Sequence, residues 1–109
     1  MLRGVHVVVL ITAPSRDEGE KVARILIEKR LAACVNVVEG VTSIYRWRGS
    51  VERSSEVLLV AKTTLKKLPA LIDTVRSVHS YEVPEIVALP IIAGFEKYLD
   101  WVSEEVSER

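Results

Sequence analysis

Hydrophobic positions along the chain first predict a set of strands. Val5 to Thr12 is almost continuously apolar and β-branched, which favours a strand. Ala33 to Thr64 predicts two long strands folded back on each other, with Arg48-Gly49-Ser50 as the turn of the hairpin. The second arm of this hairpin is apolar on both sides of the pleat between Val57 and Ala61. Both faces of the sheet therefore require cover.

Apolar residues at helical spacing predict the elements that cover one of these faces. Ser15-Arg16-Asp17-Glu18 has the Ser-x-x-Glu spacing, in which a hydroxyl and a carboxylate reciprocally satisfy free N–H groups at a helix start. We expect this first helix to end at Lys29 or Arg30. A second helix is expected from Leu68 to Val78, with Pro69 tolerated in its first turn.

The rest of the pattern completes the fold. We expect a loop from His79 to Glu85, a strand from Ile86 to Ile92 and a third helix that opens after Gly94. The order β-α-β-β-α-β-α predicts an α+β fold of the ferredoxin-like, split βαβ type, with two helices on one face of a four-stranded antiparallel sheet. The other face is expected to stay open and to expose a large apolar patch. Association with copies of the same chain, most simply as a closed ring, buries such a patch.

Composition narrows the class of protein. The 109 residues are expected to form a single domain spanning residues 1–109. Fifteen basic and fifteen acidic residues give a net charge of zero, which argues against nucleic acid as a partner. The longest apolar run, Val7 to Ile11, is much shorter than the roughly 20 residues of a membrane span, so no membrane partner is expected. The single cysteine and a start without a leader pattern favour the cytoplasm.

Cys34 and His79 carry candidate metal chemistry, whereas His6 does not. Cys34, in a strand-like run, is either a buried unreactive thiol or a soft ligand for copper(I) or zinc. His79 either places an imidazolium at a helix end or acts as an imidazole ligand, with Glu82 or Glu85 nearby. His6 has no ligand spacing around it, so we expect a packing or surface role.

A second set of candidates lies on the hairpin. Tyr45 and Trp47 alternate with arginines, as in single-strand nucleic-acid binders, but large aromatics at a projecting tip more often anchor a neighbouring subunit. Glu56 and Lys62 lie among apolar residues and need partners if they are buried, for example at a subunit boundary. No Ser/His/Asp set, P-loop, GxGxxG or HExxH occurs, which disfavours the enzyme classes that use them.

Several blocks, taken in order, resemble the divalent-cation tolerance family, CutA. They are Leu31–Asn36, Thr42–Gly49, Glu56 with Lys62–Thr64, His79–Ile86 and Tyr98–Trp101, and together they span nearly the whole chain. The resemblance implies a ferredoxin-like subunit in a tight homotrimer similar to PII signal-transduction proteins. It also implies a link to cellular tolerance of copper and other divalent metals, with copper binding among family members.

Carried over residue by residue, the resemblance ties Cys34 and His79 to copper. Ile11 and Val78 stand where some bacterial members have a cysteine and a second histidine, and Ser80 replaces the proline that commonly follows the histidine. A site built here from His79 and carboxylates suits harder divalent ions better than copper(I).

Two functions of different classes follow. The first is a non-enzymatic cytoplasmic homotrimer that binds copper or another divalent metal, with candidate ligands His79, Cys34, Glu82 and Glu85. The second is a PII-like regulatory trimer that binds a small ligand or a partner protein in clefts between subunits. The residues expected to line such a cleft or the interface are Tyr45, Trp47, Glu56, Lys62, Tyr81 and, for the cleft, Glu85.

Overall fold

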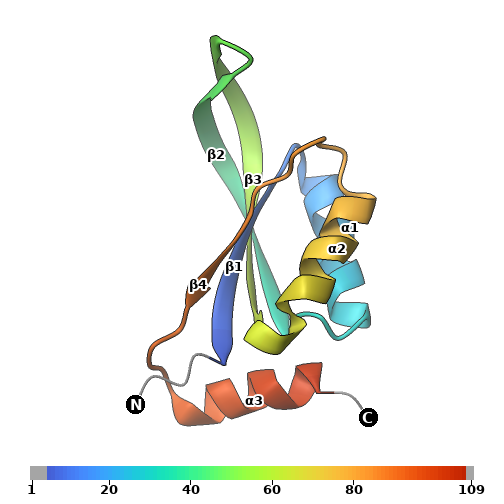
Figure 1. Ribbon diagram of the computed structural model, residues 1–109, viewed down its shortest axis with the longest axis vertical. Coiled ribbons are helices and arrows are strands. Elements are labelled where there is room, and N and C mark those ends of the chain that lie inside the picture. Colours follow the sequence, from blue (N-terminus) through green and yellow to red (C-terminus); the bar gives the residue numbers. More distant parts are fainter. Residues whose placement is uncertain (1–4, 108–109) are drawn as a thin grey trace.

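The computed structural model describes residues 5–107 and shows one four-stranded antiparallel sheet with helices (Figure 1). The elements are β1 (His6–Ala13), α1 (Arg16–Glu28), β2 (Cys34–Trp47), β3 (Ser50–Thr64), a 3-10 turn (Leu65–Lys67), α2 (Leu68–Val78), β4 (Ile86–Pro90) and α3 (Glu96–Val106). The strand order is β2-β3-β1-β4. This is the predicted split βαβ arrangement, so the predicted fold class is confirmed.

The hydrophobic core lies between the sheet and the pair α1 and α2, which run side by side against one face (Figure 1). Alternate residues of β1 and β3 point to this face and are fully buried, among them Val9, Ile11 and Leu59. The helices contribute Leu26 and Leu71, which are also fully buried.

One glycine lets α1 approach the sheet closely. A Cβ at Gly19 would lie 2.9 Å from Cγ2 of Val57 and 3.3 Å from Cδ2 of Leu59. Both are closer than ordinary van der Waals contact, and the β-branched Val57 has little freedom to move away. The absence of a side chain at position 19 therefore sets the distance between helix and sheet.

The opposite face of the sheet is largely uncovered within the subunit. Its side chains form three rows across the strands: Cys34, Lys62, Val8 and Leu89; Asn36, Val60, Leu10 and Val87; Val38, Leu58 and Thr12. Val38, Val87 and Leu89 keep between 43% and 51% of their surface exposed. The face therefore presents the apolar patch that the sequence predicted.

One end of that face is covered, which corrects the expectation of a fully open surface. α3 lies across the end of the sheet where β1 begins (Figure 1). The buried ring of His6 contacts it: Nε2 lies 2.9 Å from the carbonyl oxygen of Leu99 and 2.7 Å from Oγ of Ser103. His6 therefore has the packing role expected for it.

The hairpin of β2 and β3 projects beyond the rest of the sheet (Figure 1). Its turn is two residues long, because Ser50 already belongs to β3. Arg48 and Gly49 both have positive φ, 51° and 85°, as a type I′ turn requires. A bulge between Val38 and Val41 interrupts the register below this projecting part.

Other predicted boundaries differ slightly from those observed. α1 ends at Glu28, and the amide of the next residue, Lys29, donates to the carbonyl oxygen of Ile25. The fourth strand ends at Pro90 rather than Ile92, although the amide of Ile91 still donates to the carbonyl oxygen of His6 at 3.0 Å. Pro69 lies in the first turn of α2, as predicted.

Replacing Gly19 tests the close approach of α1 to β3. Gly19→Ala gains helix propensity, but the added methyl group overlaps Val57, so we expect a net loss of about 1 to 3 kcal/mol in the free energy of unfolding. Chemical denaturation at a fixed protein concentration measures this change. Gly94→Ala is the control, because its Cβ would meet Leu99 no closer than 3.4 Å. A Gly19→Ala protein as stable as Gly94→Ala would contradict the packing argument.

Candidate metal and ligand site

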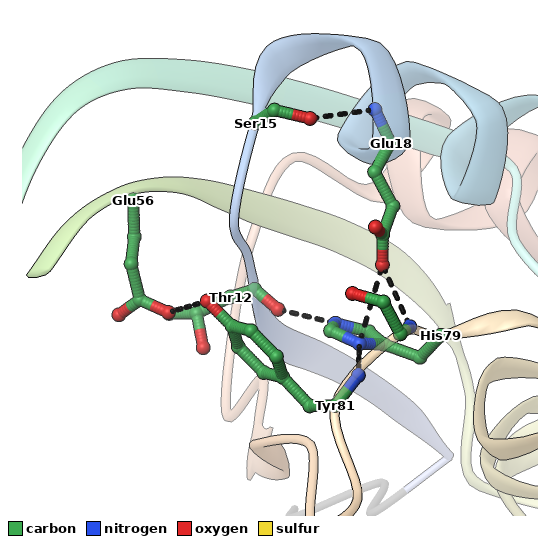
Figure 2. Close-up of polar contacts among 7 residues, drawn as sticks. Thr12, Ser15, Glu18, Glu56, His79 and Tyr81 are labelled. Atoms are coloured by element: carbon green, nitrogen blue, oxygen red, sulfur yellow. Dashed lines mark hydrogen bonds and ion pairs between the residues drawn. The ribbon is translucent and has the colours of Figure 1, made fainter.

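The candidate site lies in the loop that follows α2. His79 is the C-cap of that helix, and its ring is buried, with none of the side-chain surface exposed. Nε2 lies 2.7 Å from the carbonyl oxygen of Thr12, and Nδ1 accepts from the amide N–H of Tyr81 at 3.0 Å (Figure 2). Because a carbonyl can only accept and an amide N–H can only donate, Nε2 carries a proton and Nδ1 offers its lone pair to Tyr81. Both ring nitrogens are therefore engaged by the chain itself.

Glu18 is the carboxylate that faces His79, and the sequence did not single it out as a site residue. Its Oε2 accepts from the amide N–H of Ser80 at 2.8 Å and lies 3.4 Å from Nδ1 of His79 (Figure 2). Only half of the predicted capping box is confirmed: the amide of Glu18 donates to Oγ of Ser15 at 3.2 Å, while the carboxylate is directed to the loop. The Ser-x-x-Glu motif did mark Glu18, but the amide that its carboxylate binds belongs to Ser80, 62 residues further along the chain.

Tyr81 connects this loop to the hairpin. Its ring packs at an angle against His79, with the ring centres 4.7 Å apart, and its hydroxyl donates to Oε2 of Glu56 at 2.6 Å (Figure 2). Burial, and then the hydrogen bond and negative charge of Glu56, raise the pKa of Tyr81 above its ordinary value. Tyr45, on the same face of the hairpin as Glu56, shares a hydrogen bond of 2.8 Å with Ser54. The structure thus brings Glu56, His79 and Tyr81 together.

The other carboxylates that the sequence placed near His79 lie elsewhere. Glu82 forms an exposed ion pair with Arg48 at the hairpin tip, 3.3 Å between Oε1 and Nη2. The guanidinium of Arg48 also lies 5.5 Å from the ring centre of Trp47. Glu85 is exposed. The acidic partner that the structure gives to the histidine is therefore Glu18.

Cys34 is not brought to His79. It lies opposite Lys62, which lies opposite Val8 near the start of β1, whereas His79 contacts Thr12 near the end of that strand. Val8 and Thr12 are four residues apart along β1, which corresponds to about 13 Å between the position of Cys34 and that of His79.

The surroundings of Cys34 are those of the covered end of the sheet. Its thiol lies beside the hydroxyl of Tyr98, and the pKa of that hydroxyl is raised by burial and then by this thiol. Lys62 has a partner in the same region, because its ammonium donates to Oδ1 of Asn36. Both side chains therefore belong to the surface beside α3 and not to the loop after α2.

The donor set within one subunit fits a metal ion only in part. In residues 5–107, no three side chains from His, Cys, Asp and Glu are arranged to hold an ion. Nδ1 of His79 and Oε2 of Glu18 supply a nitrogen and an oxygen donor of the kind that borderline and hard divalent ions accept. Any further ligand has to be water or a group from outside the subunit.

The fold and the site together define a class: a ferredoxin-like α+β subunit with an apolar open sheet face and a His–Glu pair at the sheet end. The family model of the CutA1 divalent ion tolerance protein matches residues 7–105. The chain therefore belongs to the CutA1 family.

Relatives and solved structures agree with this assignment. A divalent-cation tolerance protein CutA from Thermus thermophilus is 55% identical over 97 residues, which cover 89% of this chain and 94% of that protein. The human protein CutA is 50% identical over 101 residues, but the match spans 90% of this chain and only 56% of the human protein. The crystal structure of CutA1 from Oryza sativa superimposes with a TM-score of 0.93 at 42% identity, covering 96% of each chain.

The expectation of a cytoplasmic location is wrong as a general inference. One relative, from Arabidopsis thaliana, is a chloroplastic CutA, and a solved structure from Archaeoglobus fulgidus is of a periplasmic CutA, with a TM-score of 0.91 and 41% identity over 94% of this chain and 99% of that one. The physical reason is that this fold is held by packing and not by a disulfide, so its one free thiol does not distinguish a reducing from an oxidising compartment.

Among the helices of residues 5–107, none is long and apolar enough to cross a bilayer.

The hydrogen bond from the hydroxyl of Tyr81 to Glu56 makes a pH-dependent contribution to the free energy of unfolding. The pKa of Tyr81 is higher in the folded state than the value of about 10 in the unfolded chain, so the contribution is complete below about pH 10 and is lost as pH rises further. We expect the difference in unfolding free energy between wild type and Tyr81→Phe to be constant from about pH 7 to 9 and to shrink above about pH 10. Denaturant titrations across this range measure it, and a constant difference up to about pH 12 would contradict the prediction.

Proposed function

We propose that this protein is a non-enzymatic homotrimer that contributes to divalent-cation tolerance by binding a divalent metal ion, with copper(II) as the first candidate. Membership of the CutA1 family and the names of relatives such as the Thermus protein support the tolerance function. The observation that carries the metal-binding proposal is the neutral, buried His79 with Glu18 beside its Nδ1.

The proposal of self-association rests on the open face of the sheet. Leu58, Val60 and Leu10 lie in adjacent rows of a surface that the subunit itself leaves half-exposed. Soluble monomers rarely expose apolar patches of this kind, and a closed ring buries them with identical contacts on each copy. The ring that we propose has three subunits, in line with the family resemblance.

Within this proposal His79 is the principal metal ligand. Its buried Nε2–H holds the ring in one orientation, which metal-binding histidines commonly require. Cys34 lies about 13 Å along the sheet, and Glu82 is paired with Arg48, so neither belongs to the same site within one subunit.

A second candidate function is a regulatory trimer that binds a small ligand or a partner protein between subunits. The observation that favours it is the cluster of Tyr45, Glu56 and Tyr81 on and beside the projecting hairpin. Tyrosine hydroxyls and a carboxylate at a subunit boundary offer both donors and acceptors to a polar ligand. Binding of metabolites without a response to metals would favour this function over the first.

A charged residue introduced on the open face of the sheet tests whether this face forms the subunit interface. Leu10→Asp places a carboxylate in the middle row of that face, and we expect the trimer to dissociate, because an unpaired buried charge is strongly unfavourable. Sedimentation measurements of mass at micromolar concentration detect the change. Ala70→Asp, on the exposed side of α2, is the matched control and should leave the mass unchanged. A Leu10→Asp protein with the mass of the wild type would refute this use of the face.

Metal binding is tested by calorimetric titration of copper(II) and zinc(II) into metal-free protein of known mass. We expect saturable binding in the wild type and an affinity at least about tenfold lower in His79→Ala. His79→Gln, which retains a polar side chain in the loop, guards against a loss caused by unfolding. Equal affinities in the wild type and both variants would remove His79 from the metal site.

A further inference from the structure

We propose that a cleft between α3 and the 3-10 turn that joins β3 to α2 binds a small organic anion with an aliphatic body and a carboxylate head. The cleft has a volume of about 780 Å³, within the range of roughly 300 to 1,000 Å³ that is typical of small-molecule sites. It lies beside the start of β1, about 20 Å along this strand from Thr12, the residue that His79 contacts. This site is therefore separate from the proposed metal site.

Two parts of the fold form the walls of the cleft. One wall is the C-terminal half of α3, which lies across the end of the sheet, and the other is the 3-10 turn (Figure 1). The ring of His6 holds α3 in place, because its Nε2 contacts Leu99 and Ser103. The turn is held to the start of β1, because the amide of Leu65 donates to the carbonyl oxygen of Val5 at 2.7 Å. Contacts within the subunit thus fix both walls.

Most of the surface that lines the cleft is apolar. Its aliphatic side chains are those of Val5, Leu65 and Val106. Val106 is buried, whereas Val5 and Leu65 keep 45% and 51% of their surface exposed. A hydrocarbon chain placed against these residues removes apolar surface of both partners from water, which is favourable. The lining therefore suits the body of an aliphatic ligand.

The charged groups of the cleft favour an anion. Lys66 and Lys67 lie on the lining, and among the described residues no carboxylate side chain lies there with them. In residues 5–107, Lys66 forms no ion pair, so a bound anion does not have to displace an acidic side chain from it. Hydrogen bonds between an ammonium group and a carboxylate are about twice as strong as those between neutral groups.

Two hydroxyls of the lining can donate to the same head group. The carbonyl oxygen of Leu99 can only accept, so Nε2 of His6 carries a proton, and Oγ of Ser103, 2.7 Å from Nε2, accepts from it as well. The hydrogen of the Ser103 hydroxyl is then available to a ligand. The side chain of Thr64 forms no capping hydrogen bond to the turn that it precedes. A carboxylate can accept from hydroxyls and ammonium groups together, because its two oxygens carry about four lone pairs.

The cleft shares no residue with the three rows of the open sheet face. His6 and Thr64 lie opposite each other in the next row, which α3 covers. Association of subunits through the three rows therefore does not use the lining of the cleft. A ligand in the cleft bridges α3 and the turn, so its binding should stabilise the packing of α3 on the sheet.

The experiment titrates the isotope-labelled, full-length protein with octanoate and follows the backbone amides by NMR. Octanol has the same chain without the charge, and acetate has the charge with a short chain. Lys66→Gln removes one ammonium group of the cleft, and Lys21→Gln, at an exposed position of α1, is its control. Leu65→Ser removes aliphatic surface of the cleft, and Ile44→Ser, at an exposed position of the hairpin, is its control.

We expect octanoate to shift the amides of the 3-10 turn and of α3 in a saturable manner. The affinity should fall at least about threefold in Lys66→Gln and in Leu65→Ser and change less than about 1.5-fold in the two controls. Octanol and acetate should bind at least about threefold more weakly than octanoate. Amide hydrogen exchange in α3 should slow when octanoate is bound, as expected for a ligand that stabilises this helix on the sheet.

Four results would overturn the proposal. Octanoate that binds Lys66→Gln as tightly as Lys21→Gln, or octanol that binds as tightly as octanoate, would show that the charge is not recognised. Equal affinities in Leu65→Ser and Ile44→Ser would remove the aliphatic body from the recognition. Shifts confined to the open face, for example at Leu10 and Val60, would place the ligand on that apolar surface instead. Absence of shifts up to about 2 mM octanoate would exclude a site of useful affinity.

Discussion

The rest of the structure depends on the two central strands being apolar on both faces. β1 and β3 bury Val9, Ile11 and Leu59 under α1 and α2, and they direct Leu10 and Val60 to the opposite side. Two helices cover only one of these faces, and α3 covers only an end of the other (Figure 1). Folding of the single subunit therefore leaves apolar surface exposed to water, and burying that surface would be favourable. The assembly proposed above would extend the same driving force.

The candidate site depends on where the pairing of these strands stops. β4 pairs with β1 only as far as Ile11, so the carbonyl oxygen of Thr12 has no partner in β4. It accepts a hydrogen bond from Nε2–H of His79 instead. The loop that connects α2 to β4 passes over this sheet end, and Glu18 in the first turn of α1 meets it there. A buried imidazole, a carboxylate and two backbone amides converge because a sheet edge and a helix start coincide. Each polar group is satisfied by another, as burial demands.

The fold was predictable from the sequence because short local patterns predict each helix, strand and turn. The apolar, β-branched run in β3, the Ser15 cap and the glycine at the hairpin turn each specify a local structure, and their order leaves few topologies. The site was predictable only in part. His79 and Tyr81 were identified, but the carboxylate beside them was sought in Glu82 or Glu85, which are near in sequence. Glu18 comes from the opposite end of the chain, and single-sequence spacing carries no information on such a contact.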